Sequence, residues 1–434
     1  MPRASCHVSE ACARFKKSLA PEGLEGLARE TKFVQRQRVI TAASVFWAFM
    51  VALGAQPLQY ISDVLRTLNA RESWSIRYKP FWNRLAKAAF ARFMKALFQK
   101  LCRELTTEMI YSVSRGDAHF FSEIFADDGS SFAVADGLRK VFPGRFTKIK
   151  PAAVELHAHM SVLRDSLLSV ALAPDKEAER QFLPPAHSLP PRSLSLRDRG
   201  YVDVGYFEAL EEVNAYLICR AKCDLNPTIV EVHGAPARLC RKWQGRRLQE
   251  LRKGKLKRDL DLTVSWPRPW GRVFQLRLVI RYVQEKKSWT WLLTNLPRER
   301  FDADTVGRLY RLRWHIELVF KDWKSHANLH ALQSEHPAIV EGFIWASLCA
   351  ALIKRALAHW TQLVAGERAI STRIAAMAGP QVLPRLADWA RQRFALRFFE
   401  EILRFLLANA ARTHPERDRR LPPHQLGLRP VAIG

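Results

Sequence analysis

The spacing of apolar residues changes twice along this chain of 434 residues, and these changes limit the folds that it can adopt. Up to about residue 115, apolar side chains recur at the spacing of amphipathic helices. Near residue 119 the period becomes two, and residues 154–162 alternate strictly between apolar and polar types, as in a strand with one buried face. Residues 335–410 return to helical spacing. The pattern predicts an α/β protein with helical ends.

The middle of the chain indicates a mixed sheet flanked by helices. Residues 119–214 give the order strand, strand, strand, helix, strand, helix. Residues 215–297 add four expected strands, interrupted by the basic run 241–258. A long helix is expected to start within residues 301–310, where Asp302 or Asp304 can cap its N-terminus.

The charge balance indicates a polyanionic partner. The chain has 69 Lys and Arg residues against 42 Asp and Glu, a formal net charge of +27. Such an excess attracts nucleic acids, and the alternatives are a basic housekeeping protein or one that binds anionic membranes. The only long uncharged stretch, residues 39–56, lies at the short end of what spans a bilayer, and we expect it to be a buried helix.

The cysteines offer little evidence for a metal site. The chain has 7 cysteines and no C-x-x-C spacing. Cys219, Cys223 and Cys240 are a weak zinc candidate, because a fourth ligand and a second close pair are missing. Scattered cysteines in an odd number are typical of reduced thiols in a cytosol.

Residues 310–325, YRLRWHIELVFKDWKS, place a single glutamate among basic and aromatic side chains. In a helix with 100° per residue, one stripe roughly 60° wide collects the polar members. These are Tyr310, Arg313, Glu317 and Lys324, with Lys321 beside them. The opposite side carries Leu312, Ile316, Val319 and Trp323, which can pack on a core. A surface helix with Glu–Lys pairs gives the same stripe, so the geometry alone leaves both interpretations open.

The spacing Tyr-x2-Arg-x3-Glu-x6-Lys resembles the signature helix of the bacterial insertion-sequence transposases of family four, which belong to the DDE class. The preceding "TNLP" is also similar. The resemblance covers roughly residues 120–335 and implies an RNase H-like catalytic core. It also implies two further carboxylates: Asp128 in "ADDGSSF", with Asp127 as the alternative, and Asp198 in "RDRGY".

The resemblance implies that Asp128, Asp198 and Glu317 are catalytic metal ligands. The expected strand order agrees, because an RNase H-like fold carries its acids on the first strand, after the fourth and on a later helix. Two Mg²⁺ ions roughly 4 Å apart can stabilise the attacking and leaving oxygens of a phosphodiester. Such hard cations prefer carboxylate oxygens, and Mn²⁺ is expected to substitute.

The resemblance also implies DNA contacts. Tyr310, Arg313 and Lys324 are expected to contact phosphates, with help from Lys321 and from Arg199 beside Asp198. Trp289 and Trp291 share one face of an expected strand. Some relatives stack a tryptophan here on a flipped base, whereas core packing is the alternative for both.

The sequence thus predicts a DNA transposase that binds terminal inverted repeats, cuts the ends and joins 3′-OH ends to target DNA. We expect double-stranded DNA as partner, a homodimer in the synaptic complex, no membrane and a cytoplasmic location. The alternatives are a catalytically inactive DNA-binding derivative and an RNase H-like nuclease that never joins strands. The expected regions are 1–115 (helical, DNA-binding), 119–214 (first part of the core), 215–297 (β-rich insertion), 298–335 (last core helix), 336–410 (helical) and 411–434 (flexible tail).

Overall fold

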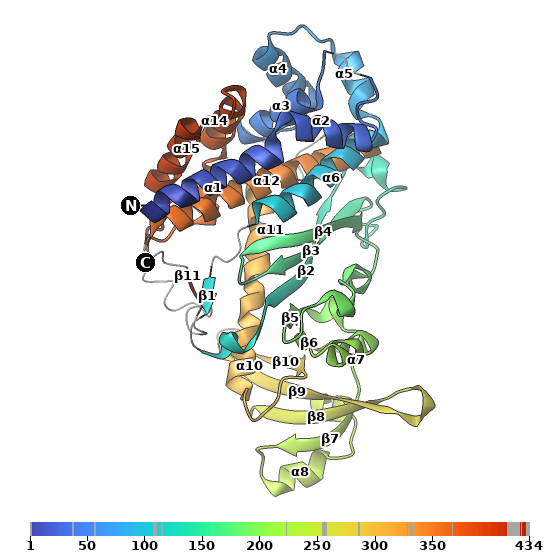
Figure 1. The fold of residues 1–434 in the computed structure, drawn as a ribbon. Coiled ribbons are helices and arrows are strands. Elements are labelled where there is room, and N and C mark those ends of the chain that lie inside the picture. Colours follow the sequence, from blue (N-terminus) through green and yellow to red (C-terminus); the bar gives the residue numbers. More distant parts are fainter. Residues whose placement is uncertain are drawn as a thin grey trace.

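A computed structural model describes most of the chain (Figure 1). The described residues are 2–36, 39–55, 58–106, 111–113, 116–222, 224–253, 258–284, 287–327, 329, 333–366, 368–414, 426 and 428–430. Most of the expected tail, residues 411–434, lies outside them.

The N-terminal region is helical, as predicted. Its helices are α1 (Pro2–Leu19), α2 (Pro21–Glu30), α3 (Ala42–Ala55), α4 (Ile61–Glu72), α5 (Tyr78–Leu85) and α6 (Ala88–Leu105). Phe46, Phe49 and Met50 of α3 are buried, so the uncharged stretch forms part of the core, as expected. Apolar residues of α4 at helical spacing, such as Val64 and Leu68, are also buried.

The C-terminal region is a second set of helices, which packs on the first. It comprises α12 (Pro337–Ala365), α13 (Thr372–Met377), α14 (Gly379–Arg391) and α15 (Leu396–Asn409). Helix α12 lies between α1 and α6, and Trp345 meets Phe98 of α6 with ring centroids 5.4 Å apart (Figure 1). Within the described residues, α12 is the one helix long and apolar enough to cross a membrane, and 78% of its most apolar window is buried inside the protein.

A nine-stranded mixed sheet lies below these helices (Figure 1). Its spatial order is β4-β3-β2-β5-β6-β10-β9-β8-β7. The strands are β2 (Ile124–Ala133), β3 (Ala153–Ser161), β4 (Ser166–Pro174), β5 (Leu194–Arg197), β6 (Tyr216–Arg220), β7 (Thr228–His233), β8 (Leu260–Pro267), β9 (Val273–Val283) and β10 (Ser288–Thr294). Strands β2, β5 and β6 pair in parallel and the other pairs are antiparallel.

Short elements connect the strands. They are η1 (Asp117–Phe120), η2 (Asp136–Leu138), η3 (Glu179–Phe182), η4 (Ala186–Ser188), η5 (Arg199–Tyr201), α7 (Val204–Glu212), α8 (Ala237–Trp243), α9 (Leu248–Lys253) and η6 (Pro269–Gly271). The expected short helix after β4 is only the 3-10 turn η3, and the basic run 241–258 contains α9 and the last three residues of α8. Strands β1 (Tyr111–Val113) and β11 (Leu428–Pro430) form a separate antiparallel pair.

The long helix expected before and through residues 310–325 is interrupted. Helix α10 (Ala303–Tyr310) is followed by a 3-10 turn, η8 (Arg311–Arg313), and then by α11 (Trp314–His326). Asp302 caps α10, because its side chain accepts a hydrogen bond from the backbone N–H of Thr305 at 2.7 Å. The expected apolar side is buried, as Leu312, Ile316, Val319 and Trp323 are each at most 3% exposed.

Candidate active site

A cleft of about 350 Å³ opens where β2, the end of β5 and the start of α11 meet. Its lining consists of Asp128, Gly129, Ser130, Asp198, Arg313, Glu317, Phe320, Lys321 and Lys324. The three predicted carboxylates thus share one cleft, although they are 189 residues apart at the extremes (128 to 317). Two of the predicted cations, Lys321 and Lys324, are exposed on its wall.

The two neighbouring aspartates of β2 have different environments, because successive side chains of a strand point to opposite faces. Asp128 faces the cleft, and its Oδ1 accepts a hydrogen bond from the N–H of Gly129 at 2.9 Å. Asp127 is buried on the other face, where Arg197 and His159 contact it. Although burial alone would raise it, these two side chains hold the pKa of Asp127 at about 2. The structure therefore places Asp128, and not Asp127, in the cleft.

Asp198 follows β5 directly and starts the turn η5. The hydroxyl of Tyr310 donates to its Oδ1 at 3.5 Å, and Nη1 of Arg220 lies 3.9 Å from the same oxygen. The Sγ of Cys219 donates to the backbone carbonyl of Asp198 at 3.4 Å. This cysteine, once a weak zinc candidate, thus packs against the turn, and Cys223 lies outside the described residues.

Arg313 joins two of the carboxylates. Its Nη1 donates to Oδ2 of Asp128 at 2.6 Å, and its Nη2 donates to Oε1 of Glu317 one turn later in α11. Arg313 is largely buried, so little water screens these contacts. The helical stripe predicted from the sequence therefore contacts Asp128 of β2 through the guanidinium of Arg313.

The electrostatics of Asp128 reflect this crowding. Burial raises the pKa of Asp128 to about 6, against the opposing effect of Arg313. The negative charges of Asp198 and Glu317 raise it further. Like charges collected in a cleft favour a cation between them.

The carboxylates fit a hard divalent cation in their chemistry, since every donor is an oxygen. Among the described residues, however, no three His, Cys, Asp or Glu side chains are gathered closely enough to hold one ion. In this structure Arg313 supplies the positive charge next to Asp128 and Glu317. Asp128, Asp198 and Glu317 are the residues that would hold such a cation if the guanidinium of Arg313 left its position between Asp128 and Glu317.

The remaining predicted residues lie away from the cleft lining. Trp289 and Trp291 of β10 are half-buried, and both pack against the core formed around β6, β8 and β9. Trp289 meets Tyr282 with ring centroids 5.3 Å apart, and the guanidinium of Arg252 lies 4.8 Å from the ring centre of Trp291. Arg199 is exposed on η5.

Sequence reasoning missed a layer of side chains behind the two aspartates. A Cβ added to Gly129 would lie 2.5 Å from Oε1 of Glu155, and one added to Gly200 would collide with Oε2 of Glu179. Each glutamate thus packs directly on the backbone beside one candidate ligand. The only sequence signal was the alternation of residues 154–162, which placed Glu155 on one face of β3 without showing what that face meets.

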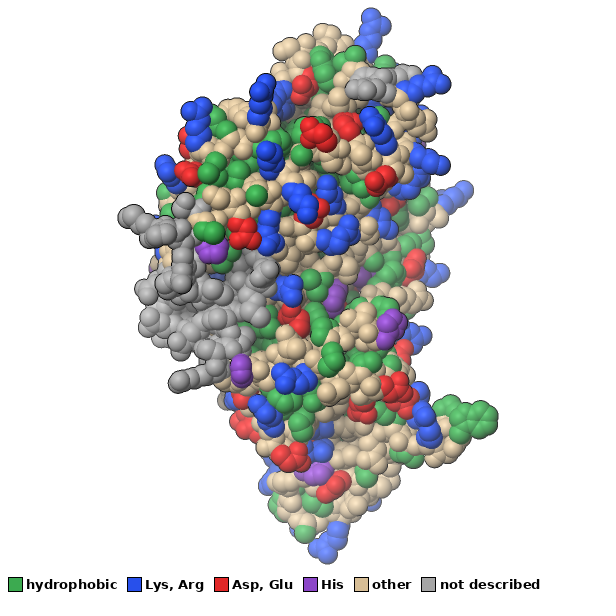
Figure 2. Space-filling view, viewed as in Figure 1, with side chains coloured by type: hydrophobic (Ala, Val, Ile, Leu, Met, Phe, Trp, Pro, Cys, Tyr) green, Lys and Arg blue, Asp and Glu red, His purple; other side chains and the backbone are tan. Residues whose placement is uncertain are grey.

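A basic face lies along α6, in the region expected to bind DNA. Residues 73–103 contain eight Lys and Arg and no Asp or Glu. Arg92, Lys95 and Arg103 are exposed along one stripe of α6. Figure 2 shows Lys and Arg side chains gathering over this helix. Such a face suits a phosphate backbone.

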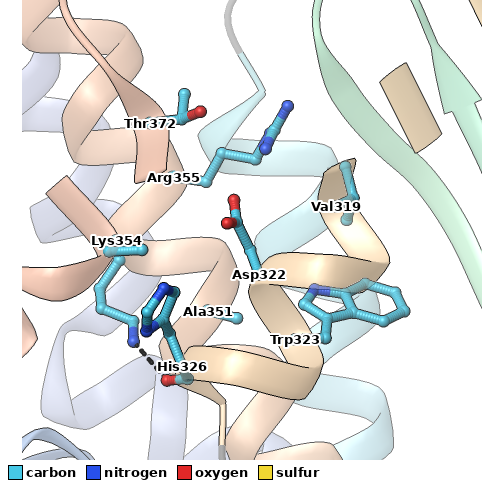
Figure 3. A pocket seen from close by; sticks show the side chains of 9 residues that line it. Val319, Asp322, Trp323, His326, Ala351, Lys354, Arg355 and Thr372 are labelled. Carbon is cyan, nitrogen blue, oxygen red and sulfur yellow. Dashed lines mark hydrogen bonds between the residues drawn. The ribbon is translucent and has the colours of Figure 1, made fainter. Parts of the chain in front are cut away.

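The side of α11 away from the cleft borders a small cavity of about 20 Å³ between α11, α12 and α13. Figure 3 shows Lys354 reaching the carbonyl of His326, at 3.0 Å, with Asp322 and Arg355 around the same cavity. Lys354 is 4% exposed, and its ammonium group meets the C-terminal end of α11, where cations are favoured. The cavity therefore marks how the C-terminal end of the cleft helix is anchored.

Comparison with known proteins identifies the family of the chain. The family model of the transposase DDE domain matches residues 120–353. The transposase for insertion sequence element IS231F of Bacillus thuringiensis subsp. israelensis is 22% identical over 373 residues, 77% of each chain. That of IS231E from Bacillus thuringiensis subsp. finitimus is 24% identical over 379 residues, 76% of each chain.

A shorter match is closer in identity. The putative transposase InsL for IS186A of Escherichia coli (strain K12) is 40% identical over 83 residues, 19% of this chain and 21% of that protein. The DDE match runs from η1 into α12, so the mixed sheet with its flanking helices is an RNase H-like core. Since it covers more than half of the chain, the protein belongs to the DDE transposases of insertion sequences.

Proposed function

We propose that this enzyme cuts both ends of an insertion sequence and joins the 3′-OH ends to target DNA, with Asp128, Asp198 and Glu317 as ligands for Mg²⁺. The observation that carries the proposal is the meeting of these carboxylates, from β2, the turn after β5 and α11, in one cleft with exposed lysines on its wall. The family depends on divalent metal in general. Mg²⁺ is the expected ion because the donors are oxygens, and Mn²⁺ is expected to substitute.

The chain's own residues divide the remaining work. Bound Mg²⁺ would activate the attacking oxygen and stabilise the leaving oxygen. Lys321 and Lys324 bind phosphates beside the scissile bond as point charges. Arg313 exchanges its carboxylate contacts for a phosphate, which its planar guanidinium can grip with two N–H groups. Tyr310 orients Asp198 through its hydroxyl.

The DNA path extends beyond the cleft. The helices of residues 1–115, and above all the basic face of α6, bind the duplex outside the cutting position. Arg199 contributes a further phosphate contact, and Trp289 and Trp291 stack on unpaired bases near the cut. Two copies act together in the synaptic complex, in the cytoplasm, on double-stranded DNA. The 215–297 region belongs to this DNA-binding surface as an insertion within the core.

The experiment is cleavage of DNA that carries the ends of the element, with Mg²⁺ and with EDTA. Glu317→Gln should abolish cleavage while end binding, measured by mobility shift, stays within a few-fold of wild type. The control is Glu401→Gln, which removes an exposed carboxylate from α15 and should cut normally. Equal loss of binding and cleavage in Glu317→Gln would contradict the ligand role.

Joining needs a separate readout. With a supercoiled target plasmid present, wild-type protein should give strand-transfer products that carry the element's 3′ ends. Cleavage without joining under all conditions would point to a nuclease. Specific end binding without any cut, in Mg²⁺ or Mn²⁺, would point to an inactive DNA-binding derivative.

A further inference from the structure

A row of polar side chains, buried at Asp127 and Arg197, crosses three strands on the face of the sheet opposite the cleft. Asp127 of β2 stands in its centre, and its Oδ1 lies 2.7 Å from Nδ1 of His159 on β3. Its Oδ2 accepts a hydrogen bond from Nε of Arg197 on β5 at 2.8 Å. Asp127 is 3% exposed and Arg197 is 0% exposed. Two charges are thus enclosed where only partners, and no bulk water, can satisfy them.

Each member of this ion pair directly precedes a candidate metal ligand. Asp127 precedes Asp128, and Arg197 precedes Asp198. Asp127 and Arg197 are also the last of the four residue pairs that align β2 with β5. The ion pair therefore lies where β2 and β5 lead to Asp128 and Asp198 in the cleft.

Arg197 also links the two ends of the segment that carries Asp198. Nη2 of Arg197 donates to the hydroxyl oxygen of Tyr206 at 3.2 Å, and that hydroxyl donates to the carbonyl of Pro184 at 2.6 Å. Tyr206 belongs to α7, which begins just after the turn. Arg197 and Tyr206 thus hold the two ends of the segment that contains Asp198.

We propose that Asp127 and Arg197 are positioning residues, which set the register of β2 against β5 and thereby the separation of the Asp128 and Asp198 carboxylates. This role rests on the proposed function, in which those two carboxylates hold the same metal centre. It adds to that function an explanation of how ligands that belong to two separate strands are held at a fixed separation.

The parallel pairing of β2 with β5 is short, and this explains why a further contact is needed to fix its register. Four residue pairs specify a register weakly, and a shift by two residues would keep every side chain on its own face. The shift would, however, leave Asp127 and Arg197 buried without each other, which is strongly unfavourable. A buried ion pair with a purely structural role would also stabilise the fold, so the test must separate folding from metal geometry.

The test uses the full chain and two readouts: thermal unfolding, and Mn²⁺ affinity from the electron paramagnetic resonance signal of free Mn²⁺. The variants are Asp127→Asn, Arg197→Met and the double variant Asp127→Leu with Arg197→Met. The matched control is Arg277→Met, which breaks another ion pair of a buried arginine, between Arg277 of β9 and the half-buried Asp261 of β8 at 2.6 Å. Wild type and the four variants are all measured below the lowest unfolding temperature.

We expect Mn²⁺ affinity to fall at least about tenfold in both single variants and to stay within twofold of wild type in Arg277→Met, although that control also unfolds earlier. The apolar double variant should recover stability, because apolar pairs often replace buried ion pairs without loss. It should still bind Mn²⁺ weakly, because nothing restores the register. If Arg197→Met does not fold, Asp127→Asn, which keeps the size of the side chain, decides the question.

Unchanged Mn²⁺ affinity in the folded single variants would overturn the positioning role. Recovery of both stability and Mn²⁺ affinity in the double variant would overturn it too, since the ion pair would then only hold the sheet together. A wild-type protein that binds no Mn²⁺, with or without duplex DNA, would instead overturn the proposed metal site and this role with it.

Discussion

The guanidinium of Arg313 lies between the carboxylates of Asp128 and Glu317 and donates to both. Because Arg313 precedes Glu317 by one helical turn, the same segment brings both the acid and the cation that neutralises it. The arginine thus balances the negative charge of two acids in the cleft. Under the proposed function, this relationship would couple metal binding and DNA binding through a single side chain.

Arg313→Gln should therefore separate metal binding from catalysis. Loss of the positive charge leaves Asp128 and Glu317 free for a cation, so Mn²⁺ affinity of the DNA-free protein should rise severalfold. Cleavage should fall by roughly a hundredfold, the usual cost of removing one charged donor from a reacting group. Mn²⁺ titration and end cleavage measure the two effects. Arg311→Gln, in the same turn but exposed, is the control. A lower Mn²⁺ affinity in Arg313→Gln would contradict the proposal that Arg313 exchanges its carboxylate contacts for a phosphate.

The salt dependence of DNA binding tests whether the lysines of the cleft wall contact phosphates. Replacing both Lys321 and Lys324 by Gln removes two exposed positive charges beside Glu317. If each contacts a phosphate, the slope of log Kobs against log salt should decrease in magnitude by about 2. Fluorescence anisotropy with labelled duplex from 50 to 300 mM salt, on the order of the range where such slopes are linear, measures it. An unchanged slope would place the lysines away from DNA.

The basic face of α6 gives an independent prediction. The triple variant Arg92→Gln, Lys95→Gln, Arg103→Gln should weaken binding to end-containing and unrelated duplexes alike, because backbone contacts carry no sequence information. The control converts three exposed arginines of the C-terminal helices, Arg385, Arg397 and Arg404, to Gln. Competition mobility shifts compare the two triple variants. Equal loss in both would mean that net charge, and not the α6 face, is responsible.

Lys354 predicts an alkaline dependence of stability. Burial lowers its pKa to about 8, against an ordinary value near 10.5 in the unfolded chain. Below pH 8 both states are protonated and the cost of the buried charge is complete. Between pH 8 and 10.5 the folded state releases the proton first, so wild type should gain up to about 3 kcal/mol over Lys354→Met.

Urea unfolding of both proteins at several pH values from 7 to 10.5 measures this difference, since the subtraction removes other groups that titrate in the same range. A difference that stays constant across this range would show that Lys354 keeps its proton in the folded state. The cavity in Figure 3 would then need water or an anion beside the ammonium group.

Several features follow from local sequence alone. Strict alternation in residues 154–162 predicted β3, and the cap at Asp302 predicted the start of α10. The buried side of α11 follows from apolar spacing. These predictions succeeded because helical and strand periods are set by the backbone, and because a cap needs only its own turn.

Other features failed or stayed open for a physical reason. The 3-10 turn η8 contains no proline or glycine, so the local sequence does not predict the break between α10 and α11. Helix α9 lies within the basic run 241–258, where no helix was expected, because its Leu248 and Leu251 pack into the core around β6, β8 and β9. Strand β6, placed by sequence in the insertion, pairs in parallel with β5 and continues the same sheet.

The sequence by itself determined most element types and the basic character, since residue type and spacing carry that information. Its resemblance to the transposase family predicted Asp198, Glu317 and either Asp128 or Asp127 as the acids. Tertiary structure decided which of Asp127 and Asp128 faces the cleft, that Arg313 stands between two acids, and that Arg197 pairs with Asp127 across a short parallel ladder. These relations join residues far apart in the chain, and only the packing of strand against strand and helix against sheet brings them within hydrogen-bonding distance.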